Sequence, residues 1–354
     1  MAAFAYYRLP YQHHAVYLEQ HRGVPEIYAS VALLNGKEGF VVAPFSPSPE
    51  CPVVLIHPDE SRLLNIVGGE SPQGVGENAV TLECASRQKE LEKQAYMDDF
   101  ALFHDQLDKG IFRKIVLARK SRLTTAVPAK KLFMRACRLF PRLFVALFYT
   151  EKTGMWLMAT PEVLLKGDGR EFATMSLAGT QKAEPSHLVA DYPVEGVVWS
   201  EKNREEQQYV TDYVEQCVRE FSTDCRLKGP YTTMAAHLYH LRTDISFSLE
   251  DTRRLGDVLE RLYPTPAVCG IPKEAARSFI LDNEHQPRKY YSGFVGLLSP
   301  TGKTRLFVSL RCMNIRPDGT CELYAGGGLL KESEVEKEWG ETEAKMETIK
   351  SVLY

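Results

Sequence analysis

The chain shows short apolar runs and alternating stretches that are typical of β-strands. Residues 35–58 place β-rich runs between Gly, Pro and Ser turns, and residues 112–123 and 142–150 are further runs of strand length. Residues 154–172 predict a hairpin that turns at "GDG". Residues 290–328 predict three or four antiparallel strands with turns at "SPTGK" and "PDG". The pattern therefore favours antiparallel sheet.

Other segments space their apolar residues as a helix does. Residues 86–109 form a long amphipathic pattern that ends at Gly110, a common residue just after a helix. Residues 128–140 and 200–221 are also predicted helices, and a last helix begins near Ser333. Because helices and hairpins are interspersed, we expect the α+β class and not a doubly wound parallel sheet.

The composition of the chain mainly excludes some classes of partner and of protein. The 354 residues carry a net charge of −3 and are 44% hydrophobic, as in an ordinary soluble protein, so neither nucleic acid nor a membrane is an expected partner. The eight cysteines form no CxxC pair, and the start lacks the pattern of a secretory signal. We expect reduced thiols, a cytoplasmic protein and one large domain, since no linker divides the chain.

The predicted C-terminal helix carries glutamates of two kinds. At about 100° per residue, Glu338 and Glu341, together with Lys345, fall beside the apolar stripe that includes Trp339 and Met346. Carboxylates at the margin of a core need partners, because an unpaired buried charge is costly. The side predicted to face water holds Glu336, Glu343, Glu347 and Lys350.

The helix at 200–221 has the same feature. Glu206 lies one turn before Val210 on its apolar stripe, Lys202 lies one turn earlier, and Glu205 points away. Two helices that each present a core-margin carboxylate could hold a hard cation such as Mg²⁺, which prefers oxygen ligands. The alternative is that these glutamates are simply solvated.

Many ordered stretches resemble the chorismate-utilising enzymes, a family that includes isochorismate, salicylate, anthranilate and aminodeoxychorismate synthases. The resemblance spans residues 95–354, and residues 1–94 would be a divergent part of the same domain, 1–354. It implies an α+β fold with two stacked antiparallel β-sheets at the centre, helices outside, and the active site in a deep cleft. The matching stretches are "RKIVLAR" (113–119), "ATPEVLL" (159–165), "LAGTQK" (177–182), "SEKNREEQ" (200–207), "HLRTDI" (240–245), "LYPTPAVCGIP" (262–272), "RKYYSGFVG" (288–296), "LFVSLRC" (306–312), "LYAGGGLL" (323–330) and "EWGETEAK" (338–345).

The resemblance also implies a metal and a substrate. Mg²⁺ would be held by Glu206 and Glu341, with Glu338 as a close or water-mediated partner. The substrate would be chorismate, whose ring carboxylate the glycine run would approach through backbone amides, since glycine has no side chain. The implied substrate-binding residues are Thr180, His240, Tyr291, Arg311, Gly326, Gly327, Gly328 and Lys345.

Two further residues match the catalytic positions of the isomerising members. These members add water at C2 of chorismate while the C4 hydroxyl leaves, which needs a base and an acid. Lys114 matches the base, and Glu162 matches the acid and would need a raised pKa. Anthranilate synthases carry glutamine in place of Lys114, and aminodeoxychorismate synthases carry a nucleophilic lysine where this chain has Ala178.

An isochorismate synthase is therefore the expected member. A salicylate synthase, usually a longer chain, is the first alternative, and a chorismate-binding protein without turnover is the second. The product would feed menaquinone, siderophore or salicylate synthesis, and a monomer or weak homo-oligomer is expected. The departures from the family pattern are Asn203, Gln207, Tyr263, Cys269 and the missing arginine in "AGTQK".

Overall fold

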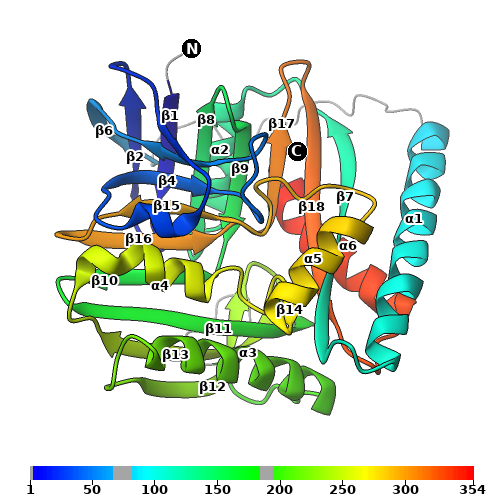
Figure 1. The fold of residues 1–354 in the computed structure, drawn as a ribbon. Helices are drawn as coiled ribbons and strands as arrows, with labels where there is room; N and C mark the ends of the chain where they lie inside the picture. The colour runs from blue at the N-terminus through cyan, green and yellow to red at the C-terminus, as the bar shows by residue number, and fades with distance from the viewer. Residues whose placement is uncertain (1–2, 67–81, 184–193) are drawn as a thin grey trace.

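Two antiparallel β-sheets of nine strands each form the centre of the protein (Figure 1). The computed structural model describes residues 3–66, 82–183 and 194–354. In spatial order the first sheet contains β14 (Gly270–Ile271), β7 (Lys114–Thr124), β18 (Thr320–Leu329), β17 (Cys312–Ile315), β9 (Gly154–Thr160), β8 (Phe144–Thr150), β1 (Ala3–Arg8), β2 (His14–Gln20) and β6 (Glu60–Asn65). The second contains β12 (Arg226–Ala235), β13 (Leu238–Ser248), β11 (Glu171–Lys182), β10 (Val163–Asp168), β16 (Lys303–Val308), β15 (Phe294–Leu298), β4 (Gly39–Ala43), β5 (Val53–Ile56) and β3 (Glu26–Tyr28).

Helices cover the outer faces of both sheets. One apolar cluster joins the inner faces of the two sheets, including Phe144 of β8 and Phe307 of β16, whose rings stack with centroids 4.0 Å apart. The outer clusters place α3 and α4 against the second sheet, and α1, α2 and α6 against the first. The helices are α1 (Leu82–Asp108), α2 (Ala129–Leu139), α3 (Glu201–Arg219), α4 (Leu255–Leu262), α5 (Lys273–Asn283) and α6 (Val335–Lys350).

The predicted α+β class with two stacked antiparallel sheets is confirmed. The predicted helices correspond to α1, α2, α3 and α6 within a few residues. The prediction of one hairpin over residues 154–172 is wrong in part. The turn at "GDG" joins β10 to β11, but β9 pairs with β8 and β17 in the first sheet. The chain crosses between the sheets at Pro161, whose ring cannot supply a strand N–H.

Residues 290–328, for which three or four strands were predicted, contain the four strands β15 to β18, and these also divide between the sheets. The hairpin of β15 and β16 belongs to the second sheet, and the hairpin of β17 and β18 belongs to the first. The chain therefore crosses between the sheets again around residues 309–311. These two crossings lie side by side: Val308 donates a backbone hydrogen bond to Glu162, and Ala159 donates one to Arg311.

Among the described residues no helix is long and apolar enough to cross a membrane. The seven cysteines whose side chains are described form no disulfide with one another, and Cys84 lies outside the described side chains.

Candidate active site

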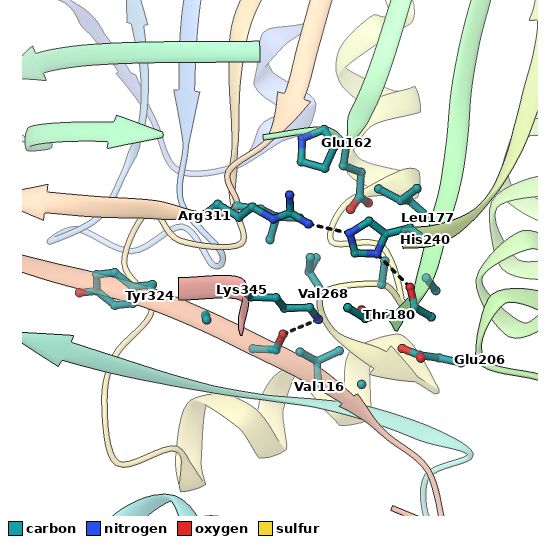
Figure 2. A pocket seen from close by; sticks show the side chains of 18 of the residues that line it. Val116, Glu162, Leu177, Thr180, Glu206, His240, Val268, Arg311, Tyr324 and Lys345 are labelled. Atoms are coloured by element: carbon teal, nitrogen blue, oxygen red, sulfur yellow. Dashed lines mark hydrogen bonds between the residues drawn. The ribbon is translucent and has the colours of Figure 1, made fainter. Parts of the chain in front are cut away.

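A cavity of about 60 Å³ lies beside the two crossings, and a wider groove of about 570 Å³ adjoins it at Thr180, which lines both. The cavity draws its walls from strands of both sheets and from α3 and α6 (Figure 2). Predicted site residues that line the cavity are Glu162, Thr180, Glu206, His240, Tyr291, Arg311, Gly326, Gly328 and Lys345. Those that line the groove are Thr180, Glu338 and Glu341.

The two crossings bring Glu162 and Arg311 into the cavity. Glu162 follows Pro161, where the chain leaves the first sheet, and Arg311 lies where the chain returns to it. Arg311 has a φ of 47°, a left-handed conformation that non-glycine residues adopt rarely and that is found at strained functional positions. Both side chains are nearly inaccessible to solvent.

The environment of Glu162 keeps its carboxyl protonated. Burial raises the pKa of Glu162 to about 8, although the nearby charges of Lys114, Lys345 and Arg311 act in the opposite direction. A carboxylic acid that holds its proton at neutral pH can donate it, which is the state that a general acid needs.

Arg311 and His240 form a hydrogen-bonded chain across the cavity (Figure 2). Arg311 Nη2 lies 2.6 Å from His240 Nε2, and His240 Nδ1 lies 2.9 Å from the carbonyl oxygen of Gly179. A guanidinium can only donate and a carbonyl can only accept, so the proton of His240 is on Nδ1. Burial, followed by the charges of Arg311 and Lys345, lowers the pKa of His240 well below its usual value. The imidazole is therefore neutral and fixes the orientation of Arg311.

A bulge in β11 and a pair of stacked rings position the residues on either side of the Arg311–His240 hydrogen bond. The pairing of β11 with β13 shifts between Ala178 and Gln181, and Gly179 within this bulge has a φ of 69°. The bulge presents Thr180 to both the cavity and the groove. On another wall, the ring of Tyr291 stacks on Tyr324 with centroids 5.5 Å apart.

Each of the three predicted metal-binding carboxylates is paired with a lysine. Lys114 is fully buried on β7, and its Nζ lies 2.9 Å from Glu206 Oε1 on α3. The lysine therefore lies behind the cavity wall, next to a carboxylate that lines it. Burial raises the pKa of Glu206, but the pairing with Lys114 outweighs it, and the net pKa is lowered.

The other two carboxylates come from neighbouring turns of α6. Lys202 of α3 forms an ion pair with Glu338, which is almost fully buried. Lys345 Nζ lies 2.7 Å from Glu341 Oε1 and 2.9 Å from the carbonyl oxygen of Gly326. Burial and the adjacent charge of Glu341 raise the pKa of Glu338, as expected when two carboxylates share one region.

The glycine run of β18 gives the carboxylates room. A Cβ atom at Gly328 would lie 2.2 Å from Glu206 Oε1, and one at Gly327 would lie 3.2 Å from Glu338 Oε2 and 3.5 Å from Glu341 Oε1. The side-chain position of Gly327 thus faces the carboxylates of α6, whereas Gly328 lines the cavity. Only side-chain-free residues allow carboxylates from two helices to approach this strand so closely.

The types of donor group fit a magnesium ion, although Glu206, Glu338 and Glu341 are not gathered tightly: among the described residues, only Glu19, His21 and Glu60 place three ligand atoms within 4.8 Å of one another. Carboxylate oxygens are hard ligands that Mg²⁺ accepts. Glu338 and Glu341 repel each other, and a divalent cation would neutralise this excess of negative charge. Glu206, Glu341 and Glu338 are therefore the residues of this chain that would hold the ion.

One predicted orientation on α6 is wrong. Glu343 was expected to face water, but it is only about a third exposed and pairs with Arg119 and Lys89. The helical wheel places Glu343 away from the apolar stripe, yet α1 and β7 cover this side as well. Glu336 and Glu347 are exposed, as expected.

The residues that depart from the family pattern lie behind the cavity walls or along the groove. The side chain of Gln207 donates to Ser176 Oγ at 2.8 Å, and the hydroxyl of Tyr263 donates to the carbonyl of Pro44. Cys269 is buried beside Val268, which lines the cavity, and Asn203 lines the groove.

Sequence reasoning left two site residues without a role. Tyr324 lines the cavity, and its position on β18, two residues before Gly326 on the same strand face, could have revealed it. Lys202 was placed on the helix face that carries Glu206, but its partner Glu338 is 136 residues away in sequence. No local pattern could predict that contact.

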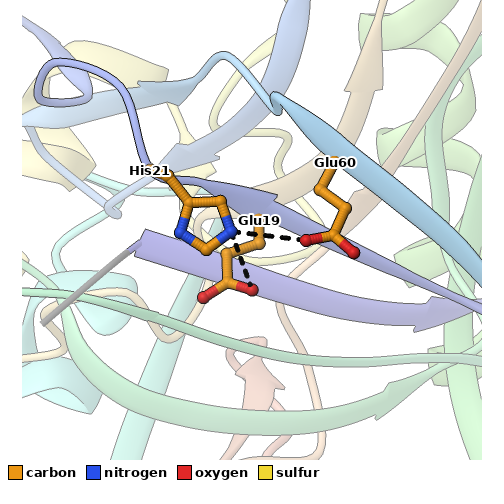
Figure 3. Close-up of side chains that lie close together, drawn as sticks. All are labelled: Glu19, His21 and Glu60. Atoms are coloured by element: carbon orange, nitrogen blue, oxygen red, sulfur yellow. Dashed lines mark hydrogen bonds and ion pairs between the residues drawn. The ribbon is translucent and has the colours of Figure 1, made fainter.

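Away from the cavity, a cluster of one histidine and two carboxylates lies on the outer strands of the first sheet (Figure 3). His21 Nε2 lies 3.4 Å from Glu19 Oε2 and 3.3 Å from Glu60 Oε2. Arg62 also pairs with Glu60, and the hydroxyl of Tyr17 donates to Glu19. The carboxylates are thus already engaged by protein groups, and His21 connects Glu19 of β2 with Glu60 of β6.

The fold and cavity define a class of protein: an α+β protein with a cavity between two sheets that Arg311 and Lys345 line, and with carboxylates beside it. Comparison with known sequences assigns the family. Residues 69–354 match the family described as "Chorismate binding enzyme", and the chain belongs to this family.

Individual relatives give the same picture. The chain is 30% identical to isochorismate synthase EntC of Escherichia coli (strain K12) over 56% of this chain and 51% of that protein. It is 31% identical to isochorismate synthase MenF of the same strain over 69% of this chain and 57% of that protein. The matches thus span little more than half the length of these relatives.

A solved structure extends the likeness in fold to the whole chain. The menaquinone-specific isochorismate synthase MenF from Escherichia coli aligns with a TM-score of 0.79 at 22% identity, covering 100% of this chain and 89% of that one.

Proposed function

We propose that the chain is a Mg²⁺-dependent isochorismate synthase, an isomerase that adds water at C2 of chorismate as the C4 hydroxyl leaves. One observation carries the proposal: the buried carboxyl of Glu162, whose pKa burial raises to about 8, and the buried pair of Lys114 and Glu206 flank the same cavity. In Figure 2 Glu162 lies above His240 and Glu206 lies below it. An acid and a base on opposite sides of a bound ring are what this isomerisation requires.

The substrate is a dianion, and the cavity offers groups for one of its carboxylates. Arg311, oriented by His240, and Tyr291 would bind the enolpyruvyl carboxylate, for which a planar guanidinium is well suited. After giving up its own proton, Lys114 would take one from the attacking water, and Glu162 would give its proton to the departing hydroxyl.

The second carboxylate, on the ring, would lie near Glu206, Glu341 and Glu338. Bound there, Mg²⁺ would neutralise this carboxylate and orient the ring. Gly326 and Gly328 line the adjacent wall, so backbone groups of β18 can come close to the ring.

The choice within the family rests on two positions. Lys114 supports water as the nucleophile, and Ala178 leaves no lysine for covalent attack at that place in β11. Isochorismate would serve menaquinone or siderophore synthesis. We propose that the enzyme is cytoplasmic and works as a monomer or weak homo-oligomer.

The proposal predicts that purified protein converts chorismate to isochorismate reversibly, and only when Mg²⁺ is present. Chromatography of the products with and without a chelator is the measurement. Salicylate and pyruvate as main products would reassign the protein to the salicylate synthases. Anthranilate formed with ammonia would contradict the proposal.

Glu341→Gln should remove most Mg²⁺-dependent activity, because the ion loses a charged ligand that contributes several kcal/mol of charge stabilisation. Calorimetry should show weaker Mg²⁺ binding, while circular dichroism stays unchanged. Glu347→Gln, on the exposed side of α6, is the matched control. Glu343 is unsuitable as a control because it pairs with Arg119. Normal activity of Glu341→Gln at ordinary Mg²⁺ concentration would exclude Glu341 as a ligand.

A further inference from the structure

Arg119 has no role in the mechanism above, although it is a nearly buried charge close to the site. It lies on β7, where side chains alternate between the two faces of the sheet. Lys114 and Val116 point towards Glu206 and the cavity. Arg119 is 6% exposed and belongs to the opposite face, where α1 and α6 pack.

The guanidinium of Arg119 contacts α6 in three different ways. It lies 3.7 Å from the ring centroid of Trp339, in a cation–π arrangement. Its Nε donates to Thr342 Oγ1 at 2.6 Å, and its Nη2 forms an ion pair with Glu343. Lysine could not make all three contacts, because only a planar guanidinium stacks on a ring while its edge donates in several directions.

These contacts interleave with the predicted metal ligands. Along α6 the residues that meet Arg119 are 339, 342 and 343, and those that face the groove or cavity are 338, 341 and 345. A shift of one residue along a helix means about 1.5 Å of translation and 100° of rotation. Such a shift would carry both carboxylates away from the glycine strand.

The start of α6 is held by contacts with other elements, including the ion pairs of Lys93 with Glu336 and of Lys202 with Glu338. Its N-cap residue, Glu334, makes no side-chain capping hydrogen bond. The first turn therefore depends on tertiary contacts for its orientation, and Glu338 lies in this turn. The hydrogen bond and stacking of Arg119 begin one residue further along.

We infer that Arg119 is a positioning residue. It fixes the rotation of α6 about its axis and its position along that axis, so that Glu338 and Glu341 meet beside Gly327. The inference rests on the proposed function, because it takes these carboxylates as the metal ligands. Arg119 would touch neither substrate nor metal. It would act like the outer partners that orient ligands in other metal sites, whose loss usually weakens metal binding about 10- to 100-fold.

The test is Mg²⁺ calorimetry on the full-length protein carrying Arg119→Met or Arg119→Lys. Arg119→Met should weaken Mg²⁺ binding about 10- to 100-fold. Arg119→Lys, which keeps the charge for Glu343 alone, should recover only part of the loss. At saturating Mg²⁺ the kcat of both variants should approach that of the wild type, so the defect lies in the Mg²⁺ concentration required. A merely structural role would lower the melting temperature without this selective change.

Controls separate this inference from the proposed function. Lys89→Met removes the exposed partner of Glu343 and should leave Mg²⁺ binding unchanged. If Arg119→Met does not fold, Arg119→Lys and Glu343→Gln test the inference instead, and both should weaken Mg²⁺ binding. Wild-type affinity in any folded Arg119 variant would overturn the inference. Failure of the wild type itself to bind Mg²⁺ would instead overturn the proposed metal site.

Discussion

Replacing Lys114 by alanine should lower kcat by about 10²- to 10⁴-fold, the usual cost of removing a general base. The KM for chorismate should change much less, because Arg311, Tyr291 and the carboxylate cluster supply most of the substrate-binding groups. A lysine that only binds a substrate carboxylate would give the opposite pattern, with a raised KM and a retained kcat. Steady-state kinetics at saturating Mg²⁺ distinguish the two.

Two further variants make this experiment specific. Lys114→Gln keeps a polar group beside Glu206 and should lose as much kcat as alanine does, since an amide cannot accept the proton. Lys120→Ala removes a lysine from the same strand that pairs with Glu322, away from the cavity, and should retain activity. A near-normal kcat in Lys114→Ala would show that another group activates the water.

Glu162→Gln should lower kcat by a similar factor of about 10²- to 10⁴-fold, because the amide has no proton to give to the departing hydroxyl. Since the wild-type pKa is raised to about 8 by burial, the active protonated form should be lost as pH rises through this value. The wild-type pH–rate profile should therefore fall on the alkaline side. The residual activity of Glu162→Gln should not show that fall.

The same substitution should stabilise the protein above acidic pH. In the unfolded chain the carboxyl loses its proton near 4.5, whereas in the folded protein it keeps it to about 8. Between these values the folded state binds more protons, so wild-type stability falls by as much as about 1.4 kcal/mol per pH unit. Denaturant unfolding should give similar free energies for the two proteins at pH 5. At pH 8 Glu162→Gln should be the more stable protein.

Equal stability of the two proteins at pH 8 would mean that Glu162 is ionised in the folded state. It could then act only as a carboxylate and not as the acid. A gain in stability together with full activity of Glu162→Gln would also contradict the assignment. It would confirm that Glu162 is protonated in the folded protein, but it would show that the reaction does not need its proton.

Much of the fold could be predicted from local pattern. The helices at 86–109, 128–140 and 200–221 follow from apolar spacing, and the turns at "GDG" and "PDG" follow from residues that favour tight turns. The pattern could not show which sheet each strand joins. The strand of residues 154–160 and the one after Pro161 were predicted as one arm of a hairpin, but they pair with strands of different sheets.

The site was predictable to a different extent. Helical spacing identified Glu206, Glu338 and Glu341 as carboxylates at the edge of a core, and resemblance to the family supplied the catalytic pair. The lysine partners of the carboxylates depend on contacts between α3, β7 and α6, which are distant in sequence. The roles of Glu343 and Arg119 depend on α1 covering a helix face that looks polar.

The most direct test of the proposed reaction is to run it in water enriched in ¹⁸O, with purified protein, chorismate and Mg²⁺. If water adds at C2 while the C4 hydroxyl leaves, the mass spectrum of isochorismate should show one ¹⁸O atom. Because the reaction is reversible, chorismate recovered at equilibrium should gain the label too. Isochorismate without ¹⁸O would contradict attack by water, and the absence of any isochorismate would contradict the proposed function itself.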